Sequence, residues 1–106
     1  MISEQQISEL VNKIVSEYSP EKIVLFGSYA EGNADVDSDL DLLVIKESIL
    51  SRTGRIVDLK SRLLKYKIMF PIDLLVYTNK ELKDENFGKF SFIANVLRTG
   101  RVLYER

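Results

Sequence analysis

Apolar residues recur with a helical period near the start of the chain. Ser3 and Gln6 stand where a capping box places its two members, and Ser19-Pro20 closes the pattern. The apolar positions between them, mostly three or four residues apart, are Ile7, Leu10, Val11, Ile14, Val15 and Tyr18. This spacing predicts an amphipathic helix over residues 4–18.

Four short apolar runs predict β-strands. The runs are Lys22–Phe26, Leu40–Ile45, residues 72–78 and the shorter Val102–Tyr104. The second run is apolar on both faces except at Asp41, which is the pattern of a strand covered on both sides. The third run follows Pro71 and carries Asp73 near its start.

Helical patterns return in the second half of the chain. Residues 51–66 predict an amphipathic helix whose apolar arc is Ile56, Val57, Leu59, Leu63 and Leu64. Three arginines lie outside that arc: Arg52, Arg55 and Arg62. They could contribute to substrate binding, but basic residues on the polar side of a helix are most often solvated, and we predict that state for them. Further helical stretches are expected from about Asn79 and from about Lys89 to Leu97.

Helices and strands thus alternate along the chain, and no repeat, linker or low-complexity segment separates them. A chain of 106 residues is long enough for one modest core but not for two. We therefore predict a single domain over residues 1–106, of the α/β (α+β) class.

The absent residue types limit the chemistry. The chain has no cysteine and no histidine, which removes thiolate sites, a thiol nucleophile and the commonest general base. Any metal must be bound by oxygen, which favours hard cations such as Mg²⁺ or Mn²⁺. A formal net charge of −1 argues against direct nucleic-acid binding. No apolar run approaches the roughly 20 residues of a membrane span and no export signal is visible, so we expect no membrane association and a cytoplasmic location.

A Gly-Ser turn, Gly27-Ser28, follows the first predicted strand and is expected to open a short helix. Glycine lets the backbone approach a ligand closely, and the N–H groups at a helix start attract anions. Ser28 adds a hydroxyl group that can reach a phosphate oxygen. Such turns are common, so this signal alone is weak.

Three aspartates add a second signal. Asp39 and Asp41 are two residues apart and share one face of the second strand, and Asp73 stands between apolar residues in the third. The ordinary explanation is a turn cap for Asp39 and a solvated strand face for Asp41. However, a carboxylate inside an apolar strand costs several kcal/mol unless it is paired or binds a metal. If the two strands are adjacent, the three carboxylates converge at one edge of the sheet and predict a metal site.

Together these residues resemble the signature of a known family. Gly27-Ser28 followed by Ser38-Asp39-Leu40-Asp41-Leu42, with Asp73 on a later strand, is similar to the motif of the polymerase β-like nucleotidyltransferase superfamily. The small size and the ending VLRTGRVLYE are most similar to the minimal nucleotidyltransferases, which are often encoded beside a helical HEPN-domain protein. The resemblance covers nearly the whole chain. It implies the nucleotidyltransferase fold, a small mixed β-sheet flanked by α-helices.

The resemblance also implies a role for each matching residue. Gly27 and Ser28 would hold the phosphates of ATP or another NTP. Asp39 and Asp41 would bind two Mg²⁺ ions, with Mn²⁺ as the alternative. Asp73 would complete the metal site and help to activate the attacking hydroxyl group.

Three functions are compatible with this resemblance. The leading one is metal-dependent transfer of AMP from ATP to a hydroxyl of a partner protein, as the antitoxin of a HEPN toxin–antitoxin pair.

The second function is that of a binding module that neutralises a HEPN partner by contact. Glu31 favours it, because many members have a basic residue there and an acidic side chain would repel a triphosphate. The third, transfer to a small molecule such as an antibiotic, is disfavoured because 106 residues leave no room for an acceptor-binding domain. The acceptor would then be brought by another protein or bound at the interface of a homo- or hetero-oligomer.

Overall fold

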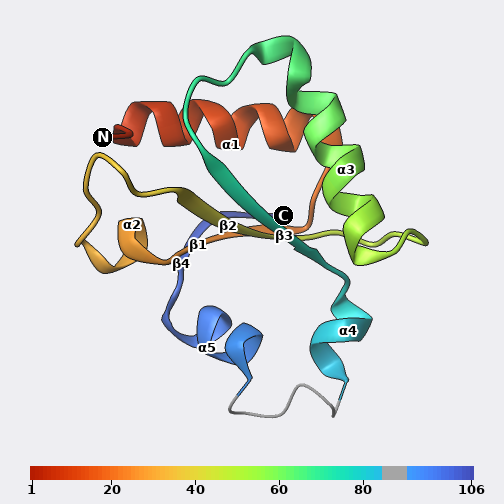
Figure 1. The fold of residues 1–106 in the computed structure, drawn as a ribbon. Coiled ribbons are helices and arrows are strands. Elements are labelled where there is room, and N and C mark those ends of the chain that lie inside the picture. The colour runs from red at the N-terminus through yellow and green to blue at the C-terminus, as the bar shows by residue number, and fades with distance from the viewer. Residues whose placement is uncertain (85–90) are drawn as a thin grey trace.

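The computed structural model describes residues 1–84 and 91–106, and a four-stranded sheet lies at its centre (Figure 1). The strands are β1 (Lys22–Phe26), β2 (Leu40–Ile45), β3 (Ile72–Tyr77) and β4 (Arg101–Glu105). Their order across the sheet is β3-β2-β1-β4; β1 runs antiparallel to β2 and β4, whereas β2 and β3 are parallel. The predicted fold class is confirmed, and β1 and β2 have the predicted boundaries.

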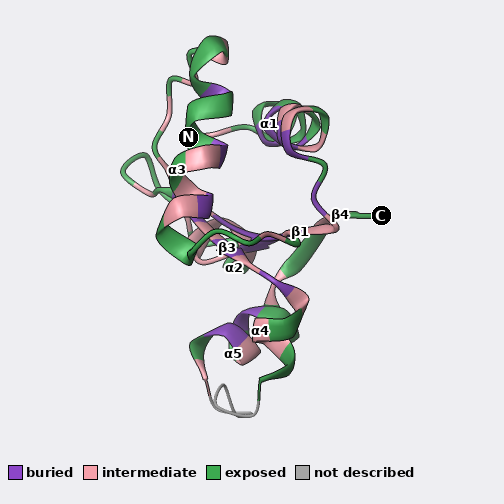
Figure 2. Cartoon of the chain, turned by 90° about the vertical axis from the view of Figure 1, so that its right-hand side faces the viewer, coloured by how far each residue is buried: buried purple, intermediate pink, exposed green. Residues whose placement is uncertain are grey.

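Helices cover both faces of the sheet. They are α1 (Glu4–Tyr18), α2 (Ser28–Glu31), α3 (Arg52–Leu63), α4 (Asn79–Lys83) and α5 (Phe92–Thr99), with a 3₁₀ turn, η1 (Leu64–Tyr66), after α3. The two views show α1 and α3 on one face, and α4 and α5 on the other (Figures 1 and 2). The larger core lies between the sheet and the helices α1 and α3, and a smaller one, built on Val24, Leu43 and Val96, includes α5. No helix in the described ranges is long and apolar enough to cross a membrane.

The predicted first helix is confirmed as α1. The Gln6 amide donates to Ser3 Oγ at 3.1 Å and the Ser3 amide donates to Gln6 Oε1 at 2.8 Å, which is the predicted capping box. Ser19 adopts the left-handed conformation after the last helical residue, and Pro20 follows it. Local sequence is therefore sufficient to define both ends of this helix.

The last elements agree with their predictions only in part. α4 begins at Asn79 as predicted, whereas the predicted start of the next helix, Lys89, lies outside the described residues. α5 continues to Thr99, two residues beyond the predicted end. β4 extends one residue further in each direction than the predicted strand.

The helix α3 lies where the sequence predicts it but buries a different face. Val57 and Leu64, which were assigned to the apolar arc, are 62% and 75% exposed. Arg55, which was predicted to be solvated, is only 5% exposed. The predicted single helix also tightens into η1 at Leu64. The buried face of α3 therefore includes a cation.

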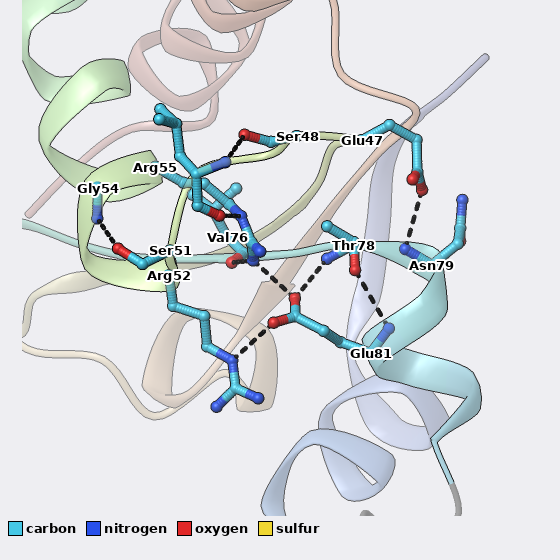
Figure 3. A network of polar contacts seen from close by, with 11 residues as sticks. Glu47, Ser48, Ser51, Arg52, Gly54, Arg55, Val76, Thr78, Asn79 and Glu81 are labelled. Carbon is cyan, nitrogen blue, oxygen red and sulfur yellow. Dashed lines mark hydrogen bonds and ion pairs between the residues drawn. The ribbon is translucent and has the colours of Figure 1, made fainter.

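Arg55 is buried because its guanidinium group satisfies polar groups near the carboxyl end of β3 (Figure 3). Its Nη1 donates to Glu81 Oε1 at 2.6 Å and to the Val76 carbonyl at 3.1 Å, and its Nε donates to the Leu50 carbonyl at 2.9 Å. Arg52 Nε donates to the other Glu81 oxygen at 3.1 Å. The prediction of a solvated side chain is wrong for Arg55, because a charged group can be buried when an opposite charge and acceptors surround it.

Candidate functional site

Asp41 and Asp73 lie side by side near the beginning of the two parallel strands. Each is the second residue of its strand, and the two are partners in the register of β2 and β3. Neighbouring strands are about 4.8 Å apart, and residues paired across them direct their side chains to the same face. The strand adjacency on which the predicted carboxylate cluster depends is therefore present.

The three carboxylates differ in exposure. Asp41 is partly buried, whereas Asp73 is exposed because β3 is an outer strand of the sheet. Asp39 lies one residue before β2 and is also exposed. The expectation of a carboxylate enclosed within an apolar strand thus holds for Asp41 alone.

The Gly27-Ser28 turn approaches Asp41 closely. Gly27 has φ 74° and ψ −155°, a backbone conformation that is essentially restricted to glycine. A Cβ atom added there would lie 2.1 Å from Asp41 Oδ2. Phe26, which precedes the turn, is the register partner of Asp41 across β1 and β2. The turn and the carboxylate therefore belong to one site, and only a residue without a side chain fits between them.

Sequence reasoning did not find this contact. It predicted that the turn and the aspartates act together, but the sequence alone shows only that they are about a dozen residues apart. The signal that could have predicted the contact is topological, because successive strands linked by a loop usually pair with each other. Antiparallel pairing of Lys22–Phe26 with Leu40–Ile45 places the end of the first strand beside the start of the second.

Asp41 experiences unfavourable electrostatics in the folded chain. Burial raises the pKa of its carboxyl group, and the nearby carboxylates of Asp73 and Asp39 raise the pKa further. Among the described residues no ion pair neutralises any of the three. A cation bound among them would relieve the repulsion.

The chemistry of these donors fits a hard divalent cation. All the donors are carboxylate oxygens, the ligands that Mg²⁺ prefers. As the side chains stand, no three acidic residues of the described ranges are grouped closely enough to hold a metal ion. Mutual repulsion of like charges favours such a spread arrangement. Asp39 is exposed in the loop before β2, two residues from Asp41.

The turn also supplies donors for an anion. Ser28 is the first residue of α2, as predicted. The Ala30 and Glu31 amides donate to the Gly27 carbonyl at 3.1 Å each, whereas the first amides of a helix have no partner within it. Glu31 is exposed at the end of α2. Carboxylates and anion-binding backbone groups in one place suit a metal-assisted reaction of a phosphate ester. The individual roles of Gly27, Ser28, Asp39, Asp41 and Asp73 stay predictions.

Comparison with known proteins gives a family and two relatives. The family described as "Polymerase beta, Nucleotidyltransferase" matches residues 9–106. "Putative protein adenylyltransferase MJ0604" of Methanocaldococcus jannaschii is 38% identical over 107 residues, which cover 98% of this chain and 100% of the relative. "Putative protein adenylyltransferase MJ0141" of the same organism is 35% identical over 77 residues, which cover 64% of this chain and 75% of the relative.

Solved structures share the fold. A "putative nucleotidyltransferase" from Sulfolobus solfataricus superposes with a TM-score of 0.65 at 20% identity, covering 94% of this chain and 78% of that chain. A second "putative nucleotidyltransferase" gives a TM-score of 0.56 at 20% identity and covers 92% of this chain and 97% of its own. At this identity the likeness concerns the fold alone.

Proposed function

Because the chain belongs to the polymerase β nucleotidyltransferase family, we propose that it transfers AMP from ATP to a hydroxyl group of a partner protein in a Mg²⁺-dependent reaction. The observation that carries this proposal is the pairing of Asp41 with Asp73 directly beside the Gly27 turn. The name of the two relatives, protein adenylyltransferase, supports a protein as the acceptor.

The proposed reaction is an in-line displacement at the α-phosphorus of ATP. The acceptor oxygen forms a bond to that phosphorus, the bond from phosphorus to the oxygen bridging to the β-phosphate breaks, and pyrophosphate leaves. The acceptor hydroxyl loses its proton in the same process. Asp73 is exposed on the acidic face and can accept the proton, and the chain has no histidine to do so.

The other site residues bind and orient. Asp39, Asp41 and Asp73 would hold the metal, which would supply positive charge to offset that of the phosphates. Gly27 carries no side chain, so the Asp41 carboxylate lies directly against the turn whose backbone would hold the phosphates. The Ser28 hydroxyl would donate to a phosphate oxygen.

The proposal extends to the partner, a HEPN-domain toxin for which this chain would be the antitoxin. It rests on the similarity of this small chain to the minimal nucleotidyltransferases. The exposure of Asp39 and Asp73 is in keeping with a partner that encloses the site when it binds.

The test combines the purified protein with Mg²⁺, labelled ATP and the product of the neighbouring gene, which the proposal expects to be a HEPN-domain protein. We expect label on that protein, and we expect EDTA, Asp39→Asn and Asp41→Asn each to remove it. Asp37→Asn is the matched control, because Asp37 is an exposed carboxylate in the same loop and its loss changes the charge equally.

Two outcomes would overturn the proposal. If the partner is neutralised without label and both aspartate variants still neutralise it, the chain acts by contact. If label passes to a small acceptor when no protein partner is present, the acceptor class is wrong.

A further inference from the structure

Among the described strands, β2 alone pairs with the outer strand β3, so the other edge of β3, beside the candidate site, has no strand partner there. The carbonyls of Pro71 and Tyr77 accept hydrogen bonds from the amides of Leu40 and Lys46, both at 3.0 Å. Odd-numbered positions of β3 therefore turn their backbone polar groups toward β2. The even-numbered positions Ile72, Leu74 and Val76 turn theirs to the free edge, since these directions alternate along a strand.

Arg55 binds the edge of β3 near its carboxyl end. Its Nη1 donates to the outward-facing carbonyl of Val76 at 3.1 Å. At Ile72 and Leu74, on either side of Asp73, no strand in the described ranges pairs with β3. Proteins usually protect the edges of their sheets, so an edge that is capped at one end and open beside the carboxylates is suited to binding another strand.

An apolar groove accompanies the open half of the edge. It has a volume of about 270 Å³ and is lined by Leu63, Leu64, Ile68, Phe70, Ile72 and Leu74. Leu64 is 75% exposed, so its side chain is accessible to a ligand in the groove. Lys60 and Lys67 also line the groove and make its margin positive. The groove therefore favours a segment with apolar residues at its centre and acidic residues at its ends.

Strand alternation connects this groove to the acidic face. Ile72 and Leu74 line the groove, and Asp73 between them points to the opposite face of the sheet with Asp41. A residue opposite Asp73 in an added antiparallel strand would place its Cβ about 5 Å from that of Asp73, on the same face. The two neighbours of the added residue would point into the groove.

We propose that the acceptor segment of the partner protein binds as an additional strand along Ile72–Leu74. Its hydroxyl residue then lies opposite Asp73, the apolar residues on either side fill the groove, and acidic residues further out face Lys60 and Lys67. The identity of the central residue as the acceptor rests on the proposed function. The strand pairing itself needs no catalysis, so binding and transfer can be tested separately.

The probe is an acetylated and amidated peptide, Glu-Glu-Val-Tyr-Val-Glu-Glu. Binding is followed without ATP or Mg²⁺ through the backbone amide signals of the protein in NMR spectra. We expect the largest changes at Ile72 and Leu74. Methylating the nitrogen of both valines keeps the side chains but removes the hydrogen-bond donors, and it should weaken binding by at least about tenfold.

Two exposed apolar residues provide a matched pair of variants. Leu64→Glu puts a charge into the groove, whereas Val57→Glu puts the same charge on α3 at a residue that is 62% exposed and does not line the groove. Leu64→Glu should weaken peptide binding by at least about tenfold, and Val57→Glu should leave it within about twofold. Equal effects of the two variants, or equal affinity of the methylated peptide, would overturn the edge site.

Transfer experiments distinguish the two proposals. If the partner is labelled equally well by the Leu64→Glu and wild-type proteins, the edge site is wrong and the proposed function stands. If the peptide binds at the edge but neither the peptide nor the partner receives label, the proposed function is wrong and the edge site stands.

Discussion

Two carboxylates near opposite ends of β3, Glu81 on α4 and Asp41 on the neighbouring strand β2, lie in opposite electrostatic environments. Beyond the carboxyl end of β3, burial alone would raise the pKa of Glu81, but hydrogen bonds from Arg55, the Thr78 amide and Arg52 outweigh it and lower the pKa to about 2 (Figure 3). Near its amino end, burial and the neighbouring carboxylates raise the pKa of Asp41. The chain can neutralise a partly buried carboxylate and does so at one end only. The unfavourable charge at the other end is the kind of local cost that functional sites carry.

Asp41→Asn should give the largest effect, with opposite signs for activity and stability. Because the carboxylate would hold the metal, we expect transfer to fall by at least about 10³-fold. The same change removes a repelled charge, so the free energy of unfolding at pH 7 should rise by about 1 kcal/mol after allowance for solvent screening. Transfer assays and urea denaturation of the same samples measure both quantities. A variant that is both inactive and less stable would contradict the comparison.

Arg55→Met tests the neutralised end. It keeps most of the buried volume, removes one of the donors to Glu81, and takes away the Arg55 donors to the Val76 and Leu50 carbonyls. We expect a loss of about 2–3 kcal/mol in the free energy of unfolding, since buried acceptors are left unsatisfied, whereas Glu81 keeps its bonds from Arg52 and the Thr78 amide. Arg62→Met is the control, because Arg62 is exposed and pairs with a half-buried Asp58, and ion pairs near the surface contribute about 1 kcal/mol or less. Similar losses for the two variants would show that the burial of Arg55 has no energetic importance.

Gly27→Ala tests the close approach at the acidic end. The new Cβ would lie 2.1 Å from Asp41 Oδ2, and the alanine would have to adopt a positive φ. We therefore expect the free energy of unfolding to fall by about 2–3 kcal/mol and most of the transfer activity to be lost. Gly32→Ala is the control, because Gly32 also has a positive φ but has no atom within 4 Å of an added Cβ. The free energy of unfolding of Gly32→Ala should fall by only about 1 kcal/mol, and its transfer activity should be unchanged. In an Asp41→Ala background part of the Gly27→Ala cost should disappear, which denaturation of the double variant measures.

The contrast between the two ends also separates what the sequence could predict from what it could not. The strands β1 and β2 were predicted residue for residue because apolar runs and Gly or polar boundaries are local signals. The acidic cluster was predicted only on the condition that β2 and β3 are adjacent, and a single sequence does not contain that adjacency. Its roles in binding and catalysis stay predictions.

The neutralised end was not predictable in the same way. Arg55 is buried because of Glu81, a residue 26 positions away that follows another strand. The exposed state of Val57 and Leu64 has a similar origin, because contacts with α1 and β3 decide which arc of α3 is buried. Helical periodicity identifies a helix, but the neighbouring elements choose its buried face.

The pH dependence of stability should show the two ends acting in opposite directions, with the smallest effects. Glu81 has a folded-state pKa of about 2, below the ordinary 4.5, so its contribution is complete above pH 4.5 and is lost as the pH falls toward 2. Its side chain is 23% exposed, and we expect its contribution to the free energy of unfolding to be about 2 kcal/mol after allowance for solvent screening.

Asp41 has a raised folded-state pKa, so the folded chain binds its proton more tightly than the unfolded chain does. The penalty from its charge therefore disappears as the pH falls toward the ordinary 3.8. Urea denaturation between pH 7 and pH 3 should therefore show Glu81→Gln less stable than wild type at pH 7, with a difference that shrinks in acid. Asp41→Asn should be more stable than wild type at pH 7, also with a difference that shrinks in acid. Differences of the same sign for the two variants at pH 7 would show that the two ends of β3 do not differ as their contacts indicate.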